Sequence, residues 1–126
     1  RNPSFPLLVP NPDNYFPDRN RRLHIASGAL GRFLQSLCAN YGTTVDPVYL
    51  GKPHEPIFRY AHSRLQEIAG HALPRHRVLL IGDSLASDIA GGRQFGYRTA
   101  LVLTGITQPS MSPPPSNAPE LVFETL

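Results

Sequence analysis

The stretch VLLIGDSLASDIAGG, residues 78–92, decides the fold of this chain. Its first four residues form a near-continuous apolar run, which predicts a buried strand in a sheet covered on both faces. The residues after Asp83 predict a helix that Gly96 ends, since glycine favours the left-handed position after a helix. Ser84, Asp83 and Asp88 therefore lie at or just beyond the end of a predicted strand, where a functional site is expected.

The rest of the chain predicts an alternation of strands and helices. A short strand is expected at residues 7–9 and a helix from the N-cap Ser27 to Gly42, while residues 18–25 look polar and irregular. From residue 47 onward the expected order is strand, helix, strand, helix, strand, loop and edge strand. This order favours right-handed βαβ units and a parallel α/β sheet. The helix that follows Pro56 is expected to bury one stripe of residues, namely Ile57, Tyr60, Ala61, Leu65 and Ile68.

Two charged residues follow predicted strands. Lys52 comes after residues 48–50 and Asp83 after residues 78–81, a separation of 83 − 52 = 31 residues, which is about one βαβ unit. If the two strands are adjacent, both side chains emerge at the carboxyl edge of the sheet, where ligands bind. Asp83 then suits Mg²⁺, Lys52 suits phosphoryl oxygens, and Asp88 could orient metal-bound water or Lys52. Taken singly, Asp83 reads as a helix N-cap and Lys52 as a solvated side chain.

The letters Gly-Asp-Ser-Leu also raise a second hypothesis, a serine esterase with Ser84 as nucleophile. Such an enzyme needs a general base, and esterases of the GDSL type carry an Asp-x-x-His pair downstream of the motif. All five histidines lie before Ser84, and no Asp-x-x-His occurs anywhere in the chain. The serine hypothesis therefore lacks its base.

Composition narrows the class of protein further. The chain has 126 residues, enough for one small domain, and a net charge of +3 with the basic residues spread out. That spacing argues against a nucleic-acid partner, and no apolar run approaches the length of a membrane span. The single Cys38 excludes an internal disulfide and favours a cytoplasmic location.

Two segments together resemble a known family. GKPHEPIFRYA (residues 51–61) and VLLIGDSLASDIAGGRQFGYRTALVLTGIT (residues 78–107) resemble the third and fourth motifs of the haloacid dehalogenase (HAD) superfamily, and within it class IIA, the NagD-like phosphatases. NPDNYFP (residues 11–17) and ASGALGRFLQ (residues 26–35) are similar to the segment that ends the cap domain in that class. The resemblance implies a Rossmann-like parallel core preceded by the end of a C2-type cap.

The resemblance also implies a chemistry. In the family, an aspartate attacks a phosphomonoester, and the aspartyl-phosphate is then hydrolysed with Mg²⁺ present. Carried over by position, Lys52 is the catalytic lysine, Asp83 the metal ligand and Asp88 the second acid of the fourth motif. Asn11 and Asp13 fall where cap residues approach the substrate, a small-molecule phosphate ester, although a proline-braced turn explains them slightly better.

One departure from the family is large, because the first motif, Asp-x-Asp, and the second motif are both absent from these 126 residues. We therefore expect residues 1–47 to be the C-terminal part of a cap and residues 48–126 the C-terminal half of a core. On this interpretation the chain alone is inactive, and its uncovered sheet edges favour a homodimer. The alternative is a non-catalytic HAD-like regulatory or interaction domain.

Overall fold

The computed structural model describes residues 6–20, 22–107 and 118–125. The chain divides into two compact units, one ending at Gly51 and the other beginning at Lys52. This division falls four residues after the boundary expected between residues 47 and 48. Each unit is described by itself below, and the assignment of cap and core stays a prediction.

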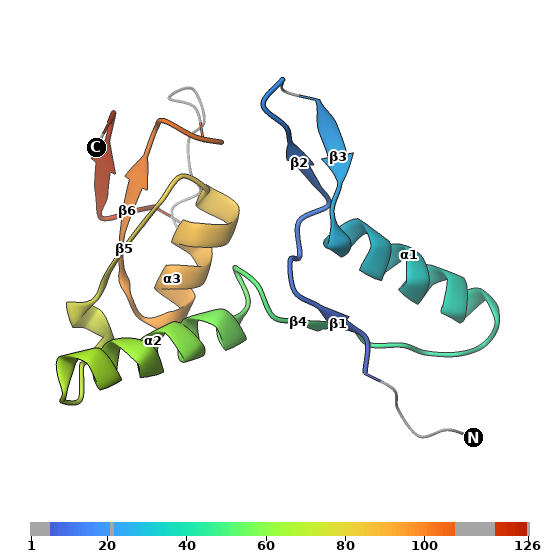
Figure 1. Ribbon diagram of the computed structural model, residues 1–126, viewed down its shortest axis with the longest axis horizontal. Helices are drawn as coiled ribbons and strands as arrows, with labels where there is room; N and C mark the ends of the chain where they lie inside the picture. Colours follow the sequence, from blue (N-terminus) through green and yellow to red (C-terminus); the bar gives the residue numbers. More distant parts are fainter. Residues whose placement is uncertain (1–5, 21, 108–117, 126) are drawn as a thin grey trace. The chain divides into compact units, whose positions relative to one another are not determined.

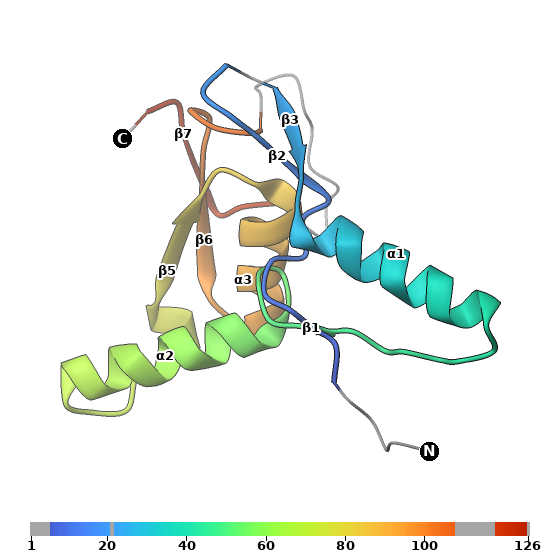
Figure 2. The same ribbon diagram turned by 45° about the vertical axis from the view of Figure 1, so that its right-hand side comes forward.

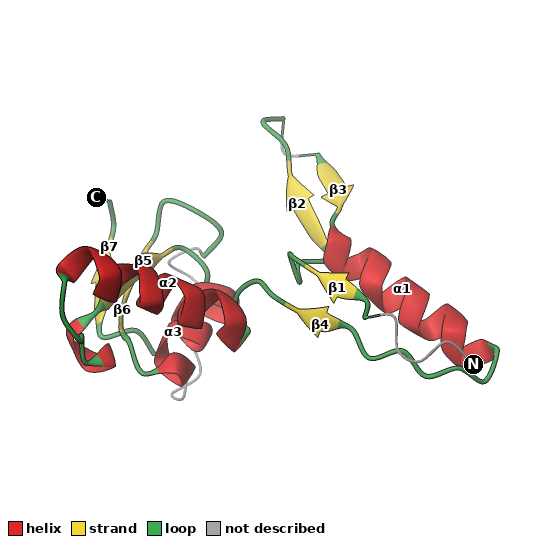
Figure 3. Cartoon of the chain, turned by 60° about the horizontal axis from the view of Figure 1, so that its bottom comes forward, coloured by secondary structure: helices red, strands yellow, loops and turns green. Residues whose placement is uncertain are grey.

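The described residues of the N-terminal unit form two small sheets and one helix (Figure 1). Strand β1 (Leu8–Val9) pairs in parallel with β4 (Val48–Tyr49), and helix α1 (Ser27–Asn40) lies beside β1 (Figure 3). The side chain of Val9 is buried against α1 at Gly31, where a Cβ would come within 2.7 Å of Val9 Cγ2. The glycine therefore permits close packing of the helix on the strand.

A β-hairpin occupies part of the segment that was expected to be irregular. Strand β2 (Tyr15–Pro17) pairs antiparallel with β3 (Leu23–Ile25). The Asp18 carboxylate closes the turn, because it accepts hydrogen bonds from Asn20 N at 2.8 Å and Arg22 N at 2.9 Å and lies 3.2 Å from His24 Nε2. The bond from Arg22 N is the main cause that holds the pKa of Asp18 below its usual value. The expectation of irregular structure was wrong at residues 23–25, since a local aspartate-centred turn outweighs the polar composition.

The start of α1 also differs from the expected capping. Ala26 is the N-cap residue and makes no side-chain cap bond, whereas Ser27 is the first helical residue. The Ser27 hydroxyl donates instead to the carbonyl of Asn11 at 2.8 Å. Gly42 follows the helix with φ +70°, as its position predicted.

The C-terminal unit is a three-stranded parallel sheet with helices packed against it (Figure 2). Along the chain it contains α2 (Glu55–Ala69), the 3₁₀ turn η1 (Arg75–Arg77), β5 (Leu79–Gly82), the π-helical turn η2 (Leu85–Ile89), α3 (Ala90–Phe95), β6 (Arg98–Val102) and β7 (Leu121–Phe123). The sheet order is β5-β6-β7, and both pairings are parallel. The parallel α/β architecture is thereby confirmed, as are the stop at Gly96, where φ is +94°, and β7 as an edge strand.

The expected adjacency of the strands before Lys52 and Asp83 is wrong. Among the described residues, β4 pairs with β1 in the N-terminal unit, while β5 pairs with β6. A strand of two residues carries too little pattern to specify its partner, and β1 provides an apolar partner 40 positions earlier in the register Leu8 to Val48.

The core of the C-terminal unit lies between its helices and one face of the sheet. Phe58, Phe95 and Tyr97 form it, with ring centroids 5.8 Å apart for Phe58 and Phe95 and 5.1 Å for Phe95 and Tyr97. The predicted stripe on α2 was therefore misplaced by one position: Phe58 is buried, whereas Ile57, Tyr60 and Ile68 are exposed. Packing against α3 sets the buried face, and Phe58 contacts that helix at Gly91.

The sequence predicted that both faces of β5 are covered, but one of them is partly exposed. Leu79 and Ile81 are 43% and 46% exposed among the described residues, while Leu80 on the opposite face packs on Gly92 of α3. The continuous apolar run of β5 therefore contributes only one of its faces to the described core. No helix in the described ranges is both long and apolar enough to cross a bilayer.

Replacing Tyr97 by phenylalanine should change how stability depends on alkaline pH. The hydroxyl of Tyr97 lies 3.1 Å from His62 Nδ1, and burial raises the Tyr97 pKa above its usual value of 10, with a smaller opposing effect of Arg75. The native state thus favours the neutral phenol, so its stabilisation is present below about pH 10 and is lost as the pH rises further. Urea unfolding between pH 8.5 and 11 should show that the free energy of unfolding falls more steeply with pH for the wild type than for Y97F. The exposed Tyr60→Phe is the control, and identical slopes for wild type and Y97F would contradict the expectation.

Candidate active site

Asp83 lies directly after β5, where the loop after β6 holds both its backbone and its side chain. Its carbonyl accepts a hydrogen bond from Thr107 N at 3.1 Å, and its Oδ2 accepts one from Ile106 N at 2.9 Å. A Cβ at Gly105 would overlap the Asp83 carboxylate, so only glycine permits this approach. The second carboxylate oxygen, Oδ1, has no hydrogen-bond partner among the described residues.

Asp88 lies on the π-helical turn, where its buried carboxylate binds Lys52. Its side chain is 5% exposed, and its Oδ1 accepts from Lys52 Nζ at 2.5 Å. Its Oδ2 accepts from Ser84 N at 3.2 Å. Gly82 makes room for it, since a Cβ there would lie 2.5 Å from Asp88 Oδ2. The buried carboxylate is therefore satisfied by one cation and one backbone N–H.

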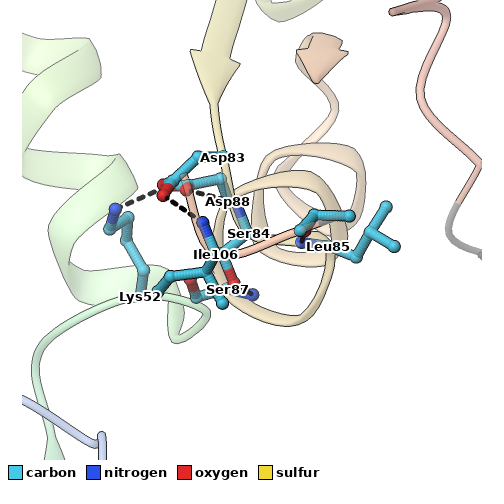
Figure 4. Close-up of polar contacts among 8 residues, drawn as sticks. Lys52, Asp83, Ser84, Leu85, Ser87, Asp88 and Ile106 are labelled. Carbon is cyan, nitrogen blue, oxygen red and sulfur yellow. Dashed lines mark hydrogen bonds and ion pairs between the residues drawn. The ribbon is translucent and has the colours of Figure 1, made fainter. Parts of the chain in front are cut away.

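Lys52 reaches the site from a turn at the start of the C-terminal unit. The Lys52–Pro53 peptide bond is cis, and the lysine side chain is 48% exposed. Figure 4 shows its ammonium pointing toward the carboxylates of Asp83 and Asp88. The structure thus brings together the three residues that the sequence predicted at this edge, although Lys52 does not come from the same sheet.

Ser84 has a structural role here. Its hydroxyl oxygen accepts a hydrogen bond from Ser87 N at 3.2 Å and caps the π-helical turn. Among the described residues, no histidine hydrogen-bonds to it. This geometry agrees with the rejection of the serine-esterase hypothesis.

The site offers part of a magnesium coordination shell. Asp83 Oδ1, which has no partner in the part of the chain that the structure describes, is a carboxylate oxygen at a strand end, the kind of ligand that Mg²⁺ prefers. Asp88 is hydrogen-bonded by Lys52 Nζ and Ser84 N, so of these two acids Asp83 is the one with an oxygen that no described residue contacts through a hydrogen bond. Within the described ranges, no three His, Cys, Asp or Glu side chains gather closely enough to hold a metal ion. The residues present therefore fit one protein ligand of Mg²⁺.

The two remaining predicted site residues belong to the N-terminal unit. Asn11 Oδ1 accepts from Asp13 N at 2.9 Å, and Gly28 N donates to the Asp13 carbonyl at 3.1 Å. These bonds describe a closed turn that meets the start of α1. A substrate-binding role for Asn11 and Asp13 stays a prediction.

The sequence interpretation missed the contribution of residues 105–107. Thr107 is buried, and its hydroxyl accepts from Leu85 N at 3.3 Å, so this loop holds both Asp83 and the turn after it. The only signal in the sequence was Gly105 just after a predicted strand, which suggests a close backbone approach.

With this geometry in place, comparison with known proteins identifies the family. Residues 49–126 match the HAD-hydrolase-like family. This match covers more than half of the chain, so the protein belongs to the HAD-like hydrolases, and its similarity to NagD-type proteins agrees with the motifs at Lys52 and Asp83.

Three relatives illustrate the similarity. The ribonucleotide monophosphatase NagD of Escherichia coli K12 is 31% identical over 101 residues, which are 80% of this chain and 34% of NagD. The sugar-phosphatase AraL of Bacillus subtilis is 31% identical over 99 residues, 79% of this chain and 32% of AraL. The crystal structure of a possible HAD-superfamily sugar phosphatase from Cytophaga hutchinsonii superimposes with a TM-score of 0.73 at 28% identity, covering 98% of this chain and 43% of that one. The chain thus spans about a third of the length of these two curated relatives.

Proposed function

We propose that this chain carries the lysine and a metal-binding acid of a Mg²⁺-dependent phosphomonoester phosphatase of HAD class IIA. The observation that carries the proposal is the Lys52–Asp88 ion pair, 2.5 Å long, beside the free carboxylate oxygen of Asp83. One cation and one available acid at a strand end suit a phosphoryl group and its metal ion. The relatives named as a ribonucleotide monophosphatase and a sugar-phosphatase support the same class of reaction.

The roles of the three residues follow from their contacts. The ammonium of Lys52 has three N–H donors; one is given to Asp88, and two are left for phosphoryl oxygens. Asp88 acts as a positioning residue, because its buried carboxylate fixes the lysine rather than facing a ligand. Asp83 would hold Mg²⁺ through Oδ1 while Ile106 N keeps its other oxygen in place. When bound, Mg²⁺ supplies neutralisation of the phosphoryl charge.

The reaction needs a nucleophile that the resemblance assigns to an aspartate outside these residues. Attack by that carboxylate on phosphorus breaks the ester bond and releases the alcohol, which takes up a proton. Water then cleaves the aspartyl-phosphate, giving inorganic phosphate and restoring the carboxylate. Throughout both steps, Lys52 can balance the negative charge on the phosphoryl oxygens.

A phosphate-release assay tests this function. The 126-residue chain should release no phosphate from p-nitrophenyl phosphate above background. A longer product of the same gene that includes the nucleophile should turn over with Mg²⁺ and lose at least about 100-fold in rate in K52M or D83N. The exposed Arg59→Gln is the matched control. Turnover by the chain alone, or wild-type rates in both site variants, would rule out these roles.

The second candidate is a non-catalytic HAD-like domain. Its support is the small number of metal ligands, since only Asp83 offers a free carboxylate oxygen among the residues described at the site. A longer gene product that binds Mg²⁺ weakly and is inactive toward a panel of phosphate esters would favour this candidate.

A further inference from the structure

A second polar hollow lies in the C-terminal unit, away from Lys52 and Asp83. Its volume is about 210 Å³. It is lined by His76, Arg93, Gly96, Tyr97, Arg98 and Glu120. Three of these six residues have basic side chains, whereas only Glu120 is acidic.

The position of the hollow separates it from the candidate active site. Arg98 is the first residue of β6 and pairs with Leu79, the first residue of β5, while Asp83 follows the last residue of β5. Four residues of strand span about 13 Å at about 3.3 Å per residue. The hollow thus lies at the amino ends of the parallel strands, and the candidate active site lies at their carboxyl ends.

Within the described ranges, the basic side chains of the hollow have hydrogen-bond donors without a partner. Arg98 Nε donates to Glu120 Oε2 at 2.7 Å, and Arg93 Nη1 donates to the Ala118 carbonyl at 2.7 Å. A guanidinium has five N–H donors, so most of those on both arginines have no partner among the described residues. The side chains of His76 and of the neighbouring Arg77 make no hydrogen bond or ion pair with any described residue. The hollow therefore holds a surplus of positive charge, because its one carboxylate is already paired.

We propose that this hollow binds a compact phosphate-type dianion. Guanidinium groups recognise phosphate oxygens with paired N–H donors, and two of them line this hollow together with an imidazole. Besides the His76 imidazole, the lining residues include one aromatic side chain, that of Tyr97, which is 6% exposed and offers no platform for base stacking. The lining therefore suits a small anion better than a nucleic-acid strand. This proposal does not depend on the proposed phosphatase function.

NMR titration of the ¹⁵N-labelled 126-residue chain with inorganic phosphate tests the site. Ionic strength is held constant with sodium chloride, since screening alone alters surface electrostatics. We expect saturable shifts at the amides of His76, Gly96 and Tyr97, with apparent affinity at least about tenfold weaker in Arg93→Gln and in Arg98→Gln. Arg98 links β6 to Glu120, so Arg93→Gln is the variant that leaves this ion pair intact.

Two controls separate this site from the candidate active site. Lys52→Met should leave the phosphate shifts at Gly96 unchanged, although it removes the cation beside Asp83. Arg59→Gln, on the exposed surface of α2, should also have no effect. Shifts confined to residues near Asp83 that disappear in Lys52→Met would overturn the proposal while supporting the phosphatase site. Shifts that chloride reproduces equally, or equal binding in Arg93→Gln, would also overturn it.

Discussion

Replacing Lys52 with methionine should lower the free energy of unfolding of the 126-residue chain by about 2 kcal/mol, although the lysine itself is half exposed. The cost arises at Asp88, whose side chain is 5% exposed and would lose the cation that compensates its charge. The Ser84 N–H, 3.2 Å from Oδ2, would be the only described partner left. The exposure of Lys52 lets water replace part of the lost interaction, which keeps the effect below that of a fully buried pair.

Asp88→Asn should cost less, about 1 kcal/mol, because a neutral amide oxygen still accepts from Ser84 N while the lysine turns to solvent. In the double variant the amide no longer needs a cation, so the two effects should fall short of their sum by about 1 kcal/mol. Urea unfolding followed by circular dichroism measures all four proteins of this cycle. Strict additivity would mean that the ion pair contributes nothing to the fold, and the Arg59→Gln control should lie close to the wild type.

The position of the candidate site after β5 was predictable from the sequence because its signals are local. The apolar run of β5, followed at once by Asp83, is typical of a ligand-binding edge, and Asp88 lies within the turn that follows. The sequence could not specify which element positions Lys52 beside Asp88. The two-residue strand before it pairs with β1, so the lysine comes from a turn and meets Asp88 36 positions away.

The other features that the sequence did not predict share a physical cause. They depend on contacts between residues distant in sequence or on contacts made by backbone atoms. Asp83 is held by the N–H groups of Ile106 and Thr107. Nearly every residue type has a backbone N–H, so the sequence does not indicate which residues donate. The buried stripe of α2 was misplaced because Ile57 and Phe58 are both apolar, and only packing on α3 selects the phenylalanine. The pairing of β2 with β3 depends on one aspartate, Asp18, that closes the turn between them.

The second large effect is expected at Gly82, where alanine should destabilise the chain by about 2–3 kcal/mol. A Cβ at this position would overlap Asp88 Cβ and Cγ and lie 2.5 Å from Oδ2. Gly82 is the last residue of β5, and its backbone is fixed by pairing with Leu101 of β6, so the strand cannot easily move away. The carboxylate must therefore shift, and its 2.5 Å contact with Lys52 should lengthen or break.

Combining the substitution with Asp88→Ala separates this clash from a general cost of alanine in the strand. Alanine at position 88 removes Cγ and both oxygens but keeps Cβ, so the double variant should recover about half of the Gly82→Ala penalty. Urea unfolding gives the stabilities, and ¹⁵N spectra report whether the Ser84 amide shifts in Gly82→Ala as its bond to Oδ2 is lost. A full penalty that persists with alanine at position 88 would place the strain in the backbone of β5 and not at the carboxylate. An unchanged Ser84 amide would show that Asp88 keeps its position, and Gly82 would then have no part in holding the lysine.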